Sequence, residues 1–352
     1  MPGVSRRRRR EFAGIFAVLF YCYGLAMAIR GAALLHLWGA GRGGRVEVAL
    51  IVVAWAVLYL GAVMPVLLGR RVDGRPRRGF FRRLRANPAA VAGFCVVMVL
   101  ICAAILAPLV SVADPTAQES AGITRYRAPS LHHPMGTDRF GRDVYSRVLF
   151  GARSTLAVAV VSVLLAVVLG TAVGVMSGYA GGLMDEIVMR VVDGLLSFPR
   201  LLAVLTLVAL FSNAYALLVL AIAATGWMGV TRLVRTEVLR VKEREFVQAA
   251  VATGIGRRGL IVRHLLPNSA GPMIVAATLN VGGVILLESY LSFLGLGVQP
   301  PAPSWGAMVF DGRDVLLEAW WVSAFPALAI VLAVTACNML GDGLHDALDT
   351  RA

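Results

Sequence analysis

Charged residues are scarce in this chain, and lysine is almost absent. Of the 352 residues, 15% are charged and 58% are hydrophobic, and the mean hydropathy is +0.76. A composition this apolar excludes a soluble globular domain of this length. Lys242 is the only lysine, and Val241 and Glu243 flank it, so the sequence contains no Gly-Lys-Ser/Thr loop that could hold a nucleotide phosphate. Any step driven by ATP must therefore involve another polypeptide.

Cysteine and histidine are also few. All of the cysteines fall within apolar runs, where a free cysteine packs as a small hydrophobic residue; they are Cys22, Cys95, Cys102 and Cys337. This placement predicts neither a disulfide framework nor a zinc site. His132 and His133 are adjacent, and neighbouring side chains point in different directions, so the pair is more typical of a solvated loop than of a metal site. We expect no metal, no cofactor bound by this chain and no catalytic constellation.

Long apolar runs dominate the rest of the sequence. A helix needs roughly 20 apolar residues to cross the hydrocarbon core of a membrane, and about eight runs approach that length. They cover residues 12–35, 46–68, 89–110, 155–177, 187–211, 214–231, 272–296 and 320–340. Asp193 and Pro199 interrupt the fifth run, which predicts an amphipathic first half and a kinked span. The sequence therefore predicts an all-α, polytopic membrane protein.

Arginines account for the net charge of +14 and cluster beside the spans, above all at residues 6–10 and 70–85. Because positive residues beside a span stay in the cytoplasm, we expect both termini inside, residues 232–271 inside, and residues 111–154 and 297–318 outside. The six arginines within 111–154 oppose this scheme. A nucleic-acid site is disfavoured because it needs a basic face on a soluble module. Contact between these arginines and anionic lipid headgroups is the better interpretation.

The loop at residues 232–271 has an unusual order for a connector. Residues 236–253 include none that breaks a helix, so we expect one helix there, and Ala249 and Ala250 give it a low surface that a partner can approach closely. Gly254 then stops the helix at a place that a side chain would resist. An ordinary connector is the plain alternative, but a loop of this length without a partner is more often disordered.

The second half of the loop continues the same pattern. Arg257 and Arg258 form a turn, and residues 260–266 predict a second short apolar helix. Pro267 is expected to end this helix before the next span begins. The sequence thus predicts a helix-turn-helix elbow that offers a docking surface to another protein.

The spacing within the elbow resembles the coupling loop of ABC importer permeases. In that family two alanines are followed by three residues and then a glycine, and a proline stands thirteen residues after that glycine; here Ala249-Ala250, Gly254 and Pro267 match. Gln248 replaces the usual glutamate, and His264 replaces a common isoleucine. A histidine at that place is familiar in the dipeptide, oligopeptide and nickel branch, so the chain resembles a permease of that branch, the C-type subunit of a pair.

Further segments resemble the same branch in order along the chain, and they cover residues 136–154, 291–306 and 341–349. The resemblance implies a six-helix, type I ABC importer permease core with an extra N-terminal transmembrane hairpin. The expected divisions are an extension at 1–79, a first core helix with its external loop at 80–153, and the permease core at 154–352. A cleaved signal peptide ending at Ala28 is the alternative to the hairpin.

The resemblance also implies a function and partners. The chain is expected to be a non-catalytic subunit that imports dipeptides or oligopeptides by alternating access, in the bacterial inner membrane. Its implied partners are a second homologous permease chain, two ATPase subunits that bind ATP and Mg, an extracytoplasmic substrate-binding protein and membrane lipid. The residues expected to carry the coupling are Gln248, Ala249, Ala250, Gly254, Arg257, Arg258, His264 and Pro267.

Other functions stay open at this point. Nickel or another small solute of the same branch is the alternative substrate. A secondary carrier driven by ions is the alternative class, but such proteins tend to have internal repeats and several buried acids. A membrane-embedded hydrolase would need paired acids or metal ligands within the spans. Neither signature is found in this sequence.

Glu288 is the one acid well inside an apolar run. A charge at the centre of a membrane costs about 2.5–3.5 kcal/mol on insertion scales, so this carboxyl group should face protein or water. Two roles are open for Glu288. It lines the translocation path or the interface between permeases, or it hydrogen-bonds a neighbouring hydroxyl or backbone group.

Overall fold

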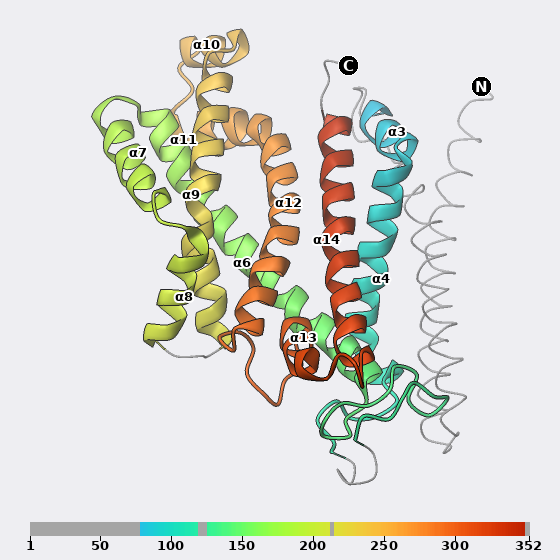
Figure 1. The fold of residues 1–352 in the computed structure, drawn as a ribbon. Coiled ribbons are helices and arrows are strands. Elements are labelled where there is room, and N and C mark those ends of the chain that lie inside the picture. Colours follow the sequence, from blue (N-terminus) through green and yellow to red (C-terminus); the bar gives the residue numbers. More distant parts are fainter. Residues whose placement is uncertain (1–77, 119–124, 212–214, 349–352) are drawn as a thin grey trace, which may run out of the picture.

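The computed structural model describes residues 78–118, 125–211 and 215–348 (Figure 1). The first two apolar runs, and with them the predicted N-terminal hairpin and the alternative signal peptide, lie outside these ranges. The described residues form helices and no strand: α3 Arg78–Ala86, α4 Pro88–Val110, α6 Val144–Ala180, α7 Gly182–Leu196, α8 Arg200–Phe211, α9 Tyr215–Lys242, α10 Glu245–Ala252, α11 Arg257–Leu260, the π-helical η1 Ile261–Leu265, α12 Leu266–Phe293, α13 Trp305–Gly312, the 3-10 helix η2 Arg313–Val315 and α14 Trp321–Leu348.

Helices of membrane-spanning length dominate the fold. Among the described residues, five helical stretches are long and apolar enough to cross a membrane. Helices α7 and α8 meet the same criterion as a pair that is bent by 82°, which gives up to six spans. Pro199 lies in the break between α7 and α8, where its missing N–H and fixed φ interrupt a helix. The all-α membrane fold, the six predicted runs from residue 89 onward and the kink in the fifth run are therefore confirmed.

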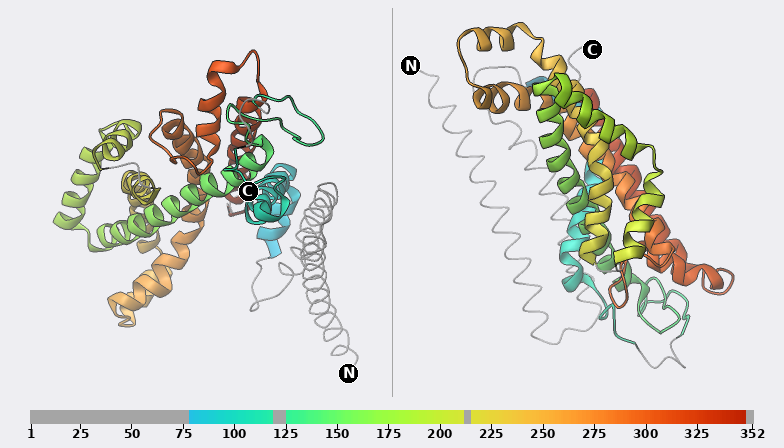
Figure 2. Two further views of the ribbon diagram at one scale, coloured as in Figure 1. Left: turned by 90° about the horizontal axis from the view of Figure 1, so that it is seen from below. Right: turned by 90° about the vertical axis from the view of Figure 1, so that its left-hand side faces the viewer.

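The two ends of the bundle carry different elements. Figure 1 shows α3, α10 and α11 at one end, and α13 with the loop at 125–143 at the opposite end. We name these the α10 end and the α13 end. Helix α6 runs obliquely between the two ends (Figures 1 and 2) and contacts α4, α9 and α12.

Helix α6 begins earlier than the hydropathy pattern predicts. It starts at Val144 rather than near residue 155, because Asp143 caps it: its carboxylate accepts hydrogen bonds from the Ser146 backbone N–H at 2.8 Å and from the Ser146 hydroxyl at 2.7 Å. Such a cap satisfies the free N–H groups of a first turn. The first turns of α6 contain buried polar residues, which is why a hydropathy criterion misses them.

Helices α6 and α9 pack closely along a row of glycines. Gly170, Gly174 and Gly178 are spaced four residues apart and share one face of α6. A Cβ at Gly170 or at Gly174 would lie 2.7 Å from a carbonyl oxygen of α9, that of Trp227 or of Thr231 respectively. Only glycine permits this approach, as in other helix pairs within membranes. The two helices therefore form one closely packed unit that leads to the α10 end.

Candidate functional site

The elbow lies at the α10 end, between α9 and α12. Helix α9 ends at Lys242, and Arg244 has extended backbone angles (φ −71°, ψ 141°) before α10 begins at Glu245. The prediction of one helix over 236–253 is wrong, because the chain breaks at residues 243–244. Val247 and Ala250 of α10 are buried in one cluster with Val241 and Leu260. Burial of this face of α10 stabilises the chain with a break at 243–244 relative to one continuous helix. Local helix propensity alone would not favour the break.

The helix after the turn also differs from its prediction. Pro267 does not end a short helix, because α11, η1 and α12 form one helical stretch from Arg257 to Phe293. The backbone N–H of Leu266 donates to the carbonyl of Ile261, which is the wider spacing of a π turn. This turn precedes Pro267, which occupies the first turn of α12, where a missing N–H is tolerated.

Gly254 determines the direction of the chain after α10. Its φ is +80°, and a Cβ built on it would have no neighbour within 4 Å. The left-handed backbone, and not lack of space, therefore calls for glycine here. Around it, the N–H of Ile255 donates to the Ala250 carbonyl at 3.3 Å and that of Gly254 to the Val251 carbonyl at 3.0 Å, a helix stop of the kind that the sequence predicts.

The residues that the sequence predicts for coupling to an ATPase do not all face the same way. Ala250 is buried, whereas Gln248, Ala249, Gly254, Arg257, Arg258 and Pro267 are exposed. His264 is half-buried, and its ring lies 6.4 Å from that of Phe246 between centroids. The structure thus brings both halves of the loop together into one elbow.

Sequence reasoning missed the exposed apolar residues of the elbow. Phe246, Val251 and Ile255 are 41%, 56% and 38% exposed. The sequence does contain a signal for this surface, because all three residues lie close to the two alanines in a loop that is otherwise mainly polar. Exposed apolar residues gathered at one place mark a contact surface more often than isolated ones do.

A groove of about 600 Å³ separates the elbow from the end of α6. It is lined by Tyr179, Ala180, Lys242, Val247, Gln248, Val251, Arg257 and Leu260. Lys242 donates from Nζ to the Tyr179 carbonyl at 3.0 Å, and its ammonium lies 5.6 Å from the centre of that ring. The single lysine therefore joins the ends of α6 and α9.

Ion pairs join α9 to the broken span. Arg235 of α9 donates from Nε and Nη2 to the two carboxylate oxygens of Asp185 of α7, both at 2.6 Å. Arg232, one turn earlier, pairs with Asp193 further along α7. Bidentate arginine–carboxylate contacts fix orientation as well as distance. The part of α9 that leads into the elbow is thus held to α7 at two points.

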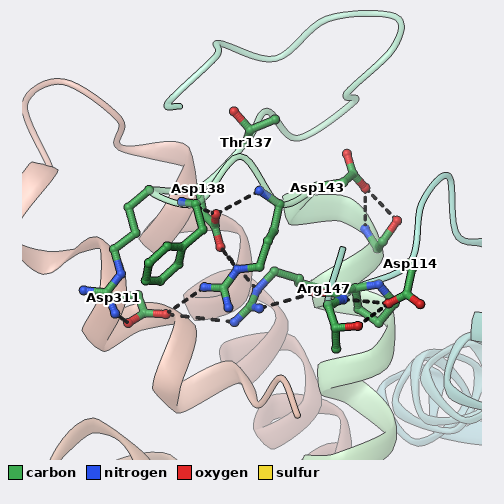
Figure 3. A network of polar contacts seen from close by, with 12 residues as sticks. Asp114, Thr137, Asp138, Asp143, Arg147 and Asp311 are labelled. Carbon is green, nitrogen blue, oxygen red and sulfur yellow. Dashed lines mark hydrogen bonds and ion pairs between the residues drawn. The ribbon is translucent and has the colours of Figure 1, made fainter. Parts of the chain in front are cut away.

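The α13 end contains a buried network of arginines and aspartates (Figure 3). Arg142 pairs with Asp138 at 2.6 Å and with Asp311 at 3.6 Å, while Arg147 lies 3.6 Å from Asp138 and 3.9 Å from Asp311. Arg139 contacts Asp311 at 3.1 Å. The positive charge of this loop was the argument against placing it outside the membrane. Two of its six arginines, Arg142 and Arg147, are buried against carboxylates, and they connect the loop to α13.

His133 departs from the prediction for this loop. Its Nδ1 lies 3.0 Å from the Asp143 carboxylate, and the ring is buried, whereas His132 is exposed. The expectation of a solvated pair is therefore wrong for His133. Among the described residues no group of three or more His, Cys, Asp or Glu side chains is placed to hold a metal ion.

Asp114, in the loop before α6, has a carboxyl group with a shifted pKa. The Asp114 carboxylate accepts hydrogen bonds from the Thr116 hydroxyl at 2.6 Å and from the Thr116 N–H at 2.8 Å. These bonds favour the ionised form and hold the pKa of Asp114 below its ordinary value. Asp114 therefore stays charged at neutral pH and fixes a local turn.

Glu288 lies inside the protein, near the α13 end of α12. It is completely buried, and its Oε1 accepts a hydrogen bond from the Ser292 hydroxyl at 2.6 Å. The Ser304 hydroxyl donates to that of Ser292 at 3.2 Å and, as the cap of α13, also accepts from the Ala307 N–H. Oε2 has no partner in the described structure. In this conformation the carboxyl group belongs to the joint between α12 and α13 and faces no open path.

Five to six spans among the described residues, with a helical elbow at one end, define a multi-span α-helical membrane protein. Residues 170–352 match the family model described as "Binding-protein-dependent transport system inner membrane component". Residues 75–129 match that of the "N-terminal TM domain of oligopeptide transport permease C". The chain therefore belongs to the family of inner-membrane permease components of binding-protein-dependent transport systems.

Curated relatives extend the similarity over most of the chain. A dipeptide transport system permease protein of Alkalihalophilus pseudofirmus is 40% identical over 276 residues, which are 78% of this chain and 90% of that protein. One of Bacillus subtilis is 41% identical, over 77% of this chain and 84% of its own. An oligopeptide transport system permease protein of Haemophilus influenzae is 39% identical, over 81% and 90%. The crystal structure of an amino acid ABC transporter covers 56% of this chain and 92% of its own, with a TM-score of 0.46 and 13% identity.

Proposed function

We propose that this chain is a permease subunit of an ATP-driven importer of dipeptides or oligopeptides. The family, together with the names of the curated relatives, supports this function. The observation that carries the mechanism is the elbow, a rigid helix with exposed apolar residues that projects from the α10 end of the spans.

In this proposal, the elbow is where a partner ATPase docks. Phe246, Val251 and Ile255 supply apolar contact area, Ala249 allows close approach, and Arg257 and Arg258 supply positive charge beside them. ATP and Mg bind to two such partner subunits, since the chain has no phosphate-binding loop of its own. Gln248 takes part through its amide, without the charge of a glutamate.

Motion of the elbow reaches the spans through the contacts of α9. The Arg235–Asp185 and Arg232–Asp193 pairs tie α9 to α7, and the glycine row ties α9 to α6. A displacement of α10 therefore moves α6, α7 and α9 together, which is the rigid-body motion that a two-state gate requires.

The remaining components follow from this function. A second homologous permease chain completes the path, and an extracytoplasmic binding protein delivers the substrate to the α13 end. The α10 end faces the cytoplasm; the arginines of α3, among them Arg83 and Arg85, support this orientation because they lie at the same end (Figure 1). Membrane lipid surrounds the exposed apolar faces.

The experiment that tests the function is uptake by vesicles that contain both permeases, the ATPases and the binding protein. We expect labelled dipeptide or tripeptide to accumulate in the compartment that the α10 end faces. This accumulation should require ATP in the same compartment, and ionophores should not affect it. Uptake of nickel or another small solute without peptide uptake would favour the alternative substrate. Uptake driven by an ion gradient without ATP would contradict the proposal and indicate a secondary carrier.

A further inference from the structure

Arg200 begins α8 at the bend in the broken span, at mid-depth in the bundle. It lies beside Gly226 of α9 and Asn280 of α12, both of which are far from the ends of their helices. Arg200 shares one face of α8 with Val204 and Val208, four and eight residues later, and both valines are buried. The guanidinium therefore points into the bundle, at a position where the other residues of this face are apolar.

No described residue forms a hydrogen bond or an ion pair with Arg200, and its Nε is buried without a partner. Arg200 is half-buried, and its guanidinium has five N–H donors. The buried part of this cation is costly without an anion or water beside it. The acids of the neighbouring helices α7 and α12 contact other groups: Asp185 contacts Arg235, Glu186 contacts Arg190, Asp193 contacts Arg232, and Glu288 accepts from Ser292. None of these acids balances the charge of Arg200, so an anion bound here would come from outside the described residues.

A small, mostly apolar cavity lies beside the guanidinium. Ser162, Gly226 and Asn280 line it together with apolar residues, and its free volume of about 10 Å³ suits about one water molecule. A Cβ on Gly226 would lie 3.2 Å from Nη2 of Arg200, so the glycine leaves the space that the guanidinium occupies. No acid lines the cavity. Arg200 is thus the one charged residue at this cavity, and none of the residues that line the cavity supplies a counter-ion.

We propose that Arg200 binds the carboxylate of a peptide as the peptide crosses the membrane. The assignment rests on the proposed peptide import, since every peptide with a free C-terminus has this carboxylate. Arginine holds a carboxylate through two parallel hydrogen bonds. The bend at residues 197–199 separates α8 from α7, so a hinge motion of α8 widens the cavity from the size of one water molecule to that of a carboxylate.

The test compares a labelled dipeptide with its C-terminal amide, in vesicles that hold the complete transporter. Wild type is compared with Arg200→Met, Arg200→Lys and a control, Arg190→Gln, at a side chain that is 80% exposed. We expect Arg200→Met, which removes both hydrogen bonds, to reduce uptake of the free peptide by at least about tenfold, the loss that a single hydrogen bond to a charged group would give. Uptake of the amide should stay unchanged. Arg200→Lys should keep part of the preference for the free peptide over its amide, because lysine retains the positive charge. The binding protein is the same in every arm of the experiment. A change in the ratio of peptide uptake to amide uptake therefore reports on the permease.

Thermal unfolding of the purified complex separates this role from a structural one. Methionine continues the apolar face of Val204 and Val208, so Arg200→Met should unfold at the same or a higher temperature. An equal loss of uptake for peptide and amide would overturn the proposal and indicate an acid of the second permease as the partner. Unchanged uptake of both would overturn it as well. If the wild-type complex takes up no peptide at all, the proposed function itself fails, and the role of Arg200 fails with it before any variant is compared.

Discussion

Gly254 is the residue on which the direction of the elbow depends most directly. A residue with a Cβ pays about 1–2 kcal/mol in the left-handed region, so Gly254→Ala should favour a straightened turn and lower ATP-driven uptake about tenfold. Asparagine tolerates this region better, and Gly254→Asn should keep more activity. Uptake per unit of permease in the membrane, measured in vesicles with the ATPases, checks the order of the variants.

Gly256 offers a matched control for this prediction. It lies two residues further on, has φ −64°, and a Cβ built on it would also meet no atom within 4 Å. Gly256→Ala should therefore leave uptake unchanged. Equal activities of Gly254→Ala and Gly256→Ala would show that the left-handed turn is unimportant for coupling.

Glu288 provides a second prediction for a single residue. Glu288→Ala removes the acceptor of the Ser292 hydroxyl and leaves a cavity, so it should destabilise the joint between α12 and α13 by about 2–4 kcal/mol. Glu288→Gln keeps the side-chain volume and one acceptor, and it should preserve both stability and uptake. Thermal unfolding in detergent measures the first effect, with the exposed Glu318 replaced by Gln as a control. A Glu288→Gln protein of normal stability that transports poorly would instead place Glu288 on the path.

At the scale of elements, the pairs between α7 and α9 lead to a prediction about coupling. Asp185→Arg or Arg235→Asp alone leaves two like charges facing each other and should weaken the α7–α9 contact by about 1–3 kcal/mol, so that ATP hydrolysis is stimulated less by the loaded binding protein. The double exchange Asp185→Arg with Arg235→Asp should restore most of the stimulation. ATPase assays on the reconstituted complex test this recovery.

The exposed pair Glu186–Arg190 on α7 is the control for the charge exchange. Its atoms are 3.9 Å apart, and the side chains are 70% and 80% exposed, so its exchange should change ATPase stimulation very little. A double mutant at Asp185 and Arg235 that is no better than either single mutant would show that the pair does not carry the motion.

The elements also show how far the sequence determines the site. Apolar length was enough to predict the spans, and Pro199 was enough to predict the bend, because both signals are local. The break at 243–244 has no local signal, since it results from burial of Val247 and Ala250 against residues of other segments. Ala250 points inward for the same reason. The free guanidinium of Arg200 follows from three helices that meet around it, which no spacing along the chain indicates.

For the whole molecule, the number of spans makes a prediction about its orientation. Helix α9 leaves the α13 end and ends at the α10 end (Figure 1), so the bent pair α7 and α8 must count as one complete crossing. The elbow and the loop at 125–143 then lie on opposite sides of the membrane. In a variant without native cysteines, a reagent that cannot cross the membrane should label Leu131→Cys in intact cells, because Leu131 is fully exposed. The same reagent should label Gln248→Cys only after the membrane is opened. Labelling of both positions in intact cells would mean that α7 and α8 return to the side from which they came, and the elbow could then no longer meet an ATPase in the cytoplasm.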